Sequence, residues 1–171
     1  KAVNFGIVYG ISDFSLSQDL KITRKEAAEY MEIYFDRYPK IKGYLESVKE
    51  EAKEKGYVLT VLNRRRFIPE IKSSNKIVKA LGERLAMNAP IQGSAADIIK
   101  LAMVKVYNRI KKENLESQMI LQVHDELILN VKENELEIVK ALVKEEMENV
   151  LKMSVTLEVD TNIGNTWYDA K

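Results

Sequence analysis

The sequence predicts an α+β fold: a mostly helical region followed by a β-hairpin, a helix and a final strand. Three observations predict it. Apolar residues recur at helical spacing through most of residues 1–114. Two β-rich runs, 119–123 and 127–131, meet at polar residues, as the strands of a hairpin do. Apolar and polar residues then alternate over 155–159, which is typical of a half-buried strand.

Helix-end signals divide the first region. Residues 1–10 predict one short helix. Thr23 and Glu26 have the spacing of a capping box, so a helix should start there and run to about Arg37. Pro39 suits the first turn of the next helix, because its missing N–H has no helical partner in that position. We therefore expect these two helices to follow the first one in succession, before any strand.

A change of pattern follows Gly56, which should end the second of these helices. Residues 57–61 predict a short strand, and a helix is expected over 75–88. Pro90 should kink or interrupt that helix because proline removes a helical hydrogen bond. The helix should resume near residue 94. We place an approximate sub-domain boundary after residue 80, which divides the chain into 1–80 and 81–171.

Composition excludes several classes of protein. Of the 171 residues, 46% are hydrophobic and 31% charged, as in soluble globular proteins. The chain has no cysteine, so disulfides and thiolate metal sites are ruled out. No apolar run approaches the roughly 20 residues that cross a bilayer, so we expect no membrane partner. The chain starts at Lys1 without Met and without a targeting signal, so we expect a piece of a longer protein.

Charge is distributed unevenly behind a net charge of +1. Residues 1–112 carry 22 Lys and Arg against 13 Asp and Glu, a net charge of +9. Residues 113–171 carry 5 against 13, a net charge of −8. A basic surface attracts a polyanion such as nucleic acid, and an acidic one can hold divalent cations. The alternative is that both regions present ordinary solvated helix faces.

Three polar residues, His124, Asp125 and Glu126, stand where the two predicted strands of the hairpin meet. Carboxylates at a strand end can ligate Mg²⁺, which prefers hard oxygen ligands. A simple polar turn explains the same triplet.

The first helix carries a second candidate site. Lys1, Phe5 and Tyr9 are spaced four apart and share one helix face. A cation, an aromatic ring and a phenol in a row can bind a phosphate, a sugar and a base. The alternative is an amphipathic helix that packs its aromatic rings into a core.

A third candidate set lies near Pro90. Arg84, Asn88 and Gln92 are again four apart and can make several hydrogen bonds each, as side chains that read the minor groove do. A helix break at Pro90 would free Gln92 from this row, and a solvated polar face is the alternative. The basic run Arg64, Arg65 and Arg66 indicates phosphate contacts, or a basic turn.

Four segments in order resemble family A DNA polymerases, the family of bacterial DNA polymerase I. They are KAVNFGIVYG (1–10), ERLAMNAPIQGSAADI (83–98), QVHDEL (122–127) and WYDAK (167–171). The resemblance covers essentially the whole chain. It implies a fingers sub-domain in 1–80 and part of the palm in 81–171. It also implies nucleotidyl transfer from a dNTP to a primer 3′-hydroxyl with a pair of Mg²⁺ ions.

The resemblance assigns roles to the candidate residues. Lys1 matches the lysine that grips the incoming triphosphate. Phe5 matches the ring against which the nucleotide packs, in the form that disfavours a sugar lacking the 3′-hydroxyl. Tyr9 matches the ring that stacks at the templating position. Asp125 matches one of two metal-binding aspartates. Contacts to DNA near the primer end are implied for Arg84, Asn88, Gln92 and His124, and an auxiliary carboxylate role for Glu126.

Partners and setting follow from the same resemblance. They are primer–template DNA, dNTP and the missing N-terminal part of the polymerase, in the bacterial cytoplasm at the nucleoid, in DNA replication and repair. The motif that bears the other metal-binding aspartate lies upstream in the family and has no counterpart here. We therefore expect this chain to be inactive alone.

Small departures and alternatives remain. Asn63 replaces a glycine that the family usually has, but asparagine tolerates positive φ. A stand-alone DNA-binding module without catalysis is an alternative. A single-subunit RNA polymerase is a third, which Phe5 and the block 90–93 disfavour.

Overall fold

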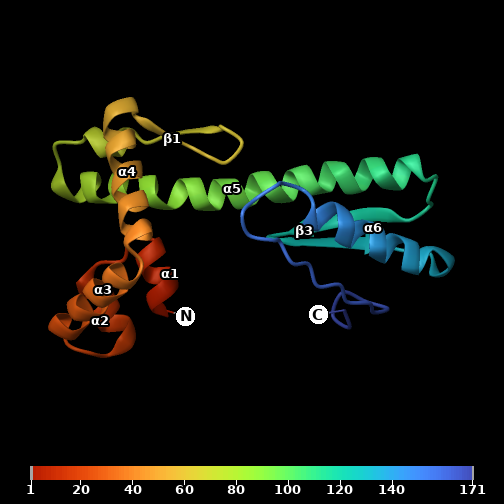
Figure 1. The fold of residues 1–171 in the computed structure, drawn as a ribbon, viewed down its shortest axis with the longest axis horizontal. Helices are drawn as coiled ribbons and strands as arrows, with labels where there is room; N and C mark the ends of the chain where they lie inside the picture. The colour runs from red at the N-terminus through yellow and green to blue at the C-terminus, as the bar shows by residue number, and fades with distance from the viewer. Residues whose placement is uncertain (1, 171) are drawn as a thin grey trace. The chain divides into compact units, whose positions relative to one another are not determined.

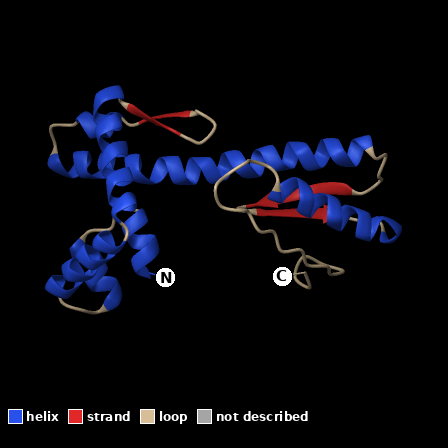
Figure 2. Ribbon diagram, in the orientation of Figure 1, coloured by secondary structure: helices blue, strands red, loops and turns tan. Residues whose placement is uncertain are grey.

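A computed structural model describes residues 2–170, and for Ala2, Phe5 and Val8 it describes the backbone alone (Figure 1). Helices and two small antiparallel sheets make up the described chain, which confirms the α+β class (Figure 2). The elements are α1 (Ala2–Val8), α2 (Asp13–Leu20), α3 (Arg24–Arg37), α4 (Pro39–Lys55), β1 (Tyr57–Leu59), β2 (Arg65–Phe67), η1 (Pro69–Lys72), α5 (Lys76–Lys112), β3 (Gln118–Val123), β4 (Glu126–Asn130), η2 (Glu133–Glu135) and α6 (Leu136–Glu148).

Contacts divide the chain into two compact units, unit 1 up to Ser94 and unit 2 from Ala95, and each is described by itself. The described helices include none that combines the length and apolar character needed to cross a membrane.

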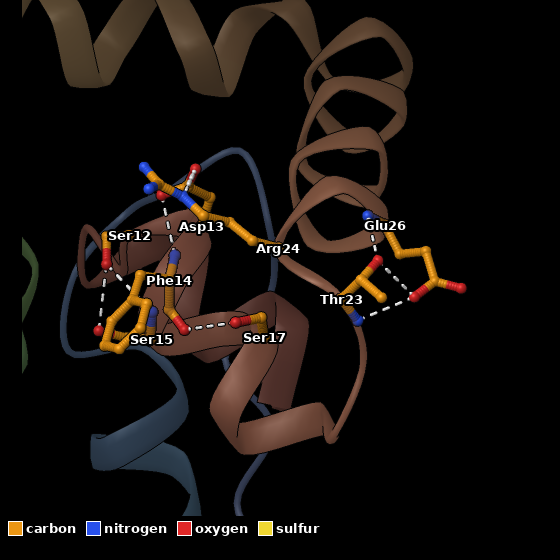
Figure 3. Close-up of polar contacts among 8 residues, drawn as sticks. All are labelled: Ser12, Asp13, Phe14, Ser15, Ser17, Thr23, Arg24 and Glu26. Atoms are coloured by element: carbon orange, nitrogen blue, oxygen red, sulfur yellow. Dashed lines mark hydrogen bonds and ion pairs between the residues drawn. The ribbon is translucent and has the colours of Figure 1, made fainter.

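The capping box predicted at Thr23 is present in unit 1. The Glu26 amide donates to Thr23 Oγ1 at 3.2 Å, and the Thr23 amide donates to Glu26 Oε2 at 2.8 Å (Figure 3). These bonds satisfy two amides that a helix start leaves without partners. The helix that they cap runs to Arg37, as predicted, and α4 starts at Pro39. Local sequence therefore determines both helix starts.

Helix α2 was not predicted. It starts because Ser12 Oγ accepts the Ser15 amide at 3.1 Å, an ordinary N-cap (Figure 3). Its first residue, Asp13, accepts from Arg24 Nε at 2.7 Å, which ties the starts of α2 and α3 together. The Arg24 hydrogen bond lowers the pKa of Asp13.

The core of unit 1 joins α4, β1, η1 and the first half of α5. Its buried residues are Val48, Ala52, Val58, Ile68, Ile71, Ala86 and Ala89. Gly82 lets η1 lie directly on α5, because a Cβ there would stand 2.5 Å from the Ile71 nitrogen. The surrounding backbone leaves no space for any side chain at this position.

Of the kink or interruption predicted at Pro90, the interruption does not occur: α5 continues through the proline. Proline inside a helix costs about 3 kcal/mol through a lost hydrogen bond and a ring clash. Here Pro90 is itself buried, and Ala86 and Ala89 are 0% and 4% exposed in the core. Tertiary packing thus holds the helix together where local preference would end it.

Two residues of the arginine run, Arg65 and Arg66, form with Phe67 a strand that was not predicted. β2 pairs antiparallel with β1, with Arg66 opposite Val58. Its residues are all exposed, so it lacks the apolar alternation by which a strand is recognised. The turn between β1 and β2 contains Asn63 with a φ of 60°, which confirms the expected tolerance of positive φ.

Unit 2 packs the hairpin β3–β4 and helix α6 around the last turns of α5. The buried core consists of Val106, Ile110, Val139, Leu142 and Val143. Leu127, Leu129 and Val131 from the hairpin side are partly buried against it. The strand register passes from Met119 opposite Leu129 to Leu121 opposite Ile128, so one residue bulges out between them.

The predicted final strand over 155–159 is wrong. Residues 151–166 are all described, and none lies in a helix or a strand. A strand needs a neighbour for its backbone hydrogen bonds, and β3 and β4 pair with each other in a sheet of two strands. The Val159 amide instead donates to Glu148 Oε1 at 3.2 Å. Alternation alone therefore did not determine a strand here.

Candidate functional site

Of the first predicted set of site residues, Lys1, Phe5 and Tyr9, the structure places Phe5 on α1 and Tyr9 in the turn after it. Lys1 falls outside the described residues, and the side chain of Phe5 is not described. Tyr9 lies one residue beyond the helix end and is 39% exposed. Gly10 follows with a φ of 71°, a conformation that glycine adopts readily. The helix therefore ends in the turn that presents Tyr9.

That turn packs on α5. A Cβ at Gly10 would lie 2.3 Å from Met87 Cε and 3.3 Å from Arg84 Cγ. A side chain here would have to displace the end of the Met87 side chain and would also have to adopt the positive φ that glycine favours. The contact brings the turn beside Tyr9 to the part of α5 that carries Arg84, so unit 1 unites two segments that lie more than 70 residues apart. Sequence patterns did not indicate Met87 as the partner of Gly10.

Arg84, Asn88 and Gln92 lie on one continuous helix, so their four-residue spacing keeps them on one face. The predicted release of Gln92 from the row by a helix break does not occur. Arg84 and Gln92 are exposed, and Asn88 is half-buried. Asn88 Oδ1 is enclosed and has no hydrogen-bond partner in the part of the chain that the structure describes. Such an unpaired oxygen costs about 1–3 kcal/mol.

The loop between β1 and β2 is fastened to the same helix. Arg64 Nη2 donates to the Gly93 carbonyl at 3.1 Å, and the Val61 amide donates to Ser94 Oγ at 2.9 Å. Gly93 permits this close approach, because a Cβ there would lie 2.5 Å from Thr60 Cγ2. Arg64 thus makes a structural contact with α5 at the residue after Gln92.

The other two arginines of the run lie on β2. The Arg65 guanidinium lies 4.9 Å from the centre of the Tyr57 ring, a cation–π distance. Arg65 and Arg66 are both exposed. They present positive charge on the β1–β2 sheet.

The hairpin tip in unit 2 holds the acidic candidates. Val123 pairs with Glu126, so His124 and Asp125 form a two-residue turn and Glu126 is the first residue of β4. All three candidates are exposed, as predicted for residues at a tip. Gln122 Nε2 donates to the His124 carbonyl at 2.6 Å and braces the turn.

His124 has a φ of 53°. Two-residue hairpin turns need positive φ and usually use glycine or asparagine, and a bulkier residue there costs roughly 1–2 kcal/mol. Histidine enters this left-handed region more readily than most residues, so the two-residue turn can form at His124.

The fit of a divalent cation can be tested on the donors present. Asp125 and Glu126 supply hard carboxylate oxygens of the kind that Mg²⁺ prefers. Within residues 2–170, however, no group of three or more His, Cys, Asp or Glu side chains gathers as a metal site would require. The tip can thus supply part of a coordination shell, and the remainder must come from elsewhere.

Comparison with known proteins places these features in a family. A sequence profile of DNA polymerase family A matches residues 1–169. The chain is 56% identical to a DNA polymerase I of Caldicellulosiruptor bescii over 171 residues, all of this chain and 20% of the relative. It is also 56% identical to a DNA polymerase I of Geobacillus stearothermophilus, with the same coverage.

A solved structure is similar as well. It is the POL domain of Pol1 from M. smegmatis in complex with DNA primer–template and dNTP. The similarity has a TM-score of 0.96 at 48% identity, and covers 99% of this chain and 30% of that one. The chain spans about a fifth of the length of the curated relatives it matches.

Proposed function

The chain belongs to DNA polymerase family A, and on this premise we propose that it forms the fingers and part of the palm of a template-directed DNA polymerase. The polymerase transfers a nucleotide from a dNTP to the 3′-hydroxyl of a primer. The observation that carries the proposal is the close packing of the α1 turn on the Arg84 region of α5. It brings together, in one unit, the helix predicted to bind the nucleotide and the residues predicted to contact the minor groove.

The sub-domains in this proposal are fingers in 1–80 and partial palm in 81–171. The division of the chain into two compact units falls after Ser94, inside α5. The fingers region and the start of the palm helix thus share one core.

Nucleotide and DNA contacts are assigned to residues of unit 1. Lys1 grips the triphosphate, and Phe5 and Tyr9 face the nucleotide and the templating position. Arg84, Asn88 and Gln92 contact base edges and sugars in the minor groove, where acceptors occur at every base pair. Arg64, Arg65 and Arg66 contact phosphates, and the exposure of Arg65 and Arg66 supports this assignment.

Asp125 is the metal-binding carboxylate in this proposal, with Glu126 auxiliary to it and His124 close to the primer end. A bound pair of Mg²⁺ ions would activate the attacking hydroxyl and stabilise the leaving pyrophosphate. The exposed tip lets both carboxylates reach such ions. The second aspartate must come from the missing N-terminal part of the polymerase, because one carboxylate cannot hold two cations in register.

The setting proposed for the full polymerase is the bacterial cytoplasm at the nucleoid, in DNA replication and repair. The names of the bacterial relatives support it.

A chimera tests the function. The matching fifth of Geobacillus stearothermophilus DNA polymerase I is replaced by this chain, which is 56% identical to it. We expect dNTP-dependent primer extension by the chimera and none by the isolated chain. A folded chimera that binds primer–template without extending it would contradict the proposal and favour the DNA-binding module. Extension by the isolated chain, above its Asp125→Ala variant, would overturn the expected inactivity.

A further inference from the structure

The hairpin that carries Asp125 is weakly held by packing. None of the residues in β3 or β4 is buried. Ile120, the residue at the bulge, is 60% exposed. The contacts of the hairpin with the core of unit 2 come from partly buried residues such as Leu127 and Leu129. Within the described residues, the apolar contacts of the hairpin with the core thus come from partly buried side chains alone.

A buried polar cluster closes the other end of the hairpin. Glu135 Oε1 accepts the Glu116 amide at 2.9 Å. Glu135 Oε2 accepts the Ser117 amide at 2.9 Å and the Ser117 hydroxyl at 2.5 Å. Ser117 Oγ in turn accepts the Lys132 amide at 3.1 Å. We call Glu135, Ser117 and the Glu116 and Lys132 amides the base clamp.

The base clamp joins three elements. Ser117 immediately precedes β3, Lys132 follows β4, and Glu135 immediately precedes α6. Ser117 and Glu135 are 3% and 9% exposed, in contrast to the strands themselves. Because α6 packs on α5 in the core of unit 2, the clamp fastens both strands to the rigid part of this unit.

A small tilt at the base moves the tip far. The six residues of β3 at about 3.3 Å each make a lever of roughly 20 Å, so a tilt of about 3° displaces the tip by about 1 Å. A misplacement of that size can reduce a catalytic rate by about a hundredfold.

We propose that Glu135 is a positioning residue for Asp125: it sets the direction of the hairpin through its base. The role of Asp125 rests on the proposed function, but the coupling of Glu135 to the hairpin does not. Glu135→Gln keeps the shape of the side chain while replacing one accepting oxygen with a donor that faces the Ser117 or Glu116 amide. Glu133→Gln is the matched control, because Glu133 lies in the same turn and is exposed.

Amide hydrogen exchange of the 171-residue chain tests the coupling directly. For Glu135→Gln we expect exchange at Leu121 and Ile128, which face each other in the hairpin, to accelerate at least tenfold, while exchange at Val106 and Val139 changes less than twofold. Ser117→Ala, a milder change, should give the same pattern at lower amplitude. Unchanged hairpin exchange, or equal acceleration at all four amides, would overturn the proposal, the latter by showing a merely structural role.

The chimera supplies a separate readout. Glu135→Gln should lower kcat for primer extension by about tenfold to a hundredfold and leave KM for dNTP unchanged, whereas Glu133→Gln changes neither. An unchanged kcat contradicts positioning. An inactive parent chimera defeats the proposed function instead, and hydrogen exchange then still decides whether Glu135 orients the hairpin.

Discussion

Unit 1 and unit 2 hold their candidate residues by opposite means. In unit 1, glycines let backbone and side chains approach closely: Gly10 against Met87, Gly93 against Thr60, and Gly82 against Ile71. In unit 2, an exposed hairpin tip is fixed at a distance by hydrogen bonds to one buried carboxylate.

The difference shows which changes each unit tolerates. A site held by close approach depends on side-chain volume, because packed interiors have no room to spare. A site held by a clamp depends on hydrogen-bond partners, because a buried donor without an acceptor is costly. We therefore expect unit 1 to be sensitive to added side-chain volume and unit 2 to be sensitive to lost hydrogen-bond partners.

The largest effect is expected from Gly82→Ala in unit 1. The added Cβ would meet the backbone of Glu70 and Ile71 at 2.5–2.8 Å, so we expect a loss of about 1–3 kcal/mol in the free energy of unfolding. Gly43→Ala is the control: Gly43 lies within α4 with nothing within 4 Å of its Cβ position, and alanine should stabilise by about 0.5–1 kcal/mol. Urea unfolding measures both. Stabilisation by both substitutions would contradict the close-approach account.

A smaller loss is expected from Thr23→Ala. The substitution removes the side-chain acceptor of the capping box at α3, which is worth about 1 kcal/mol. The hydrogen-exchange rates of the α3 amides should rise accordingly, and the rates of the α6 amides should not. Thr156→Ala, in an exposed irregular segment, serves as the control. Equal effects of the two substitutions would show that the cap does not stabilise this helix.

The subtlest effect concerns pH in unit 2. Hydrogen bonds from the Glu116 amide and from Ser117 hold the pKa of Glu135 below its ordinary value of 4.5. The stability that this group contributes is therefore fully present above about pH 4.5 and is lost as pH falls toward the lowered pKa. The stability difference between the unsubstituted chain and Glu135→Gln should shrink below pH 4.5 and stay constant from pH 5 to 7. A difference that grows on acidification would contradict the clamp.

Local signals in the sequence predicted much of the fold. The capping box at Thr23, the helix start at Pro39 and the polar tip of the hairpin all depend on a few neighbouring residues. Asn63 at positive φ belongs to the same group, since asparagine tolerates that conformation.

Errors arose where distant packing decides. The helix through Pro90 is held by its burial in the core, and residues 155–159 lack the strand partner that their alternation presupposes. The arginines of β2 pair with β1 without an apolar face. Long-range partners such as Gly10 with Met87, or Ser117 with Glu135, produce no periodic pattern in the sequence, because each member alone resembles an ordinary turn or surface residue.

The central claim is that Asp125 is a metal-binding carboxylate of nucleotidyl transfer, and single-turnover incorporation of one dNTP by the chimera tests it most directly. A bound metal ion contributes several kcal/mol to such a transition state, so Asp125→Asn should slow incorporation on the order of a thousandfold. Glu133→Gln, at an exposed carboxylate of the same unit, should leave the rate unchanged. Incorporation by Asp125→Asn at the rate of the parent chimera would contradict the claim.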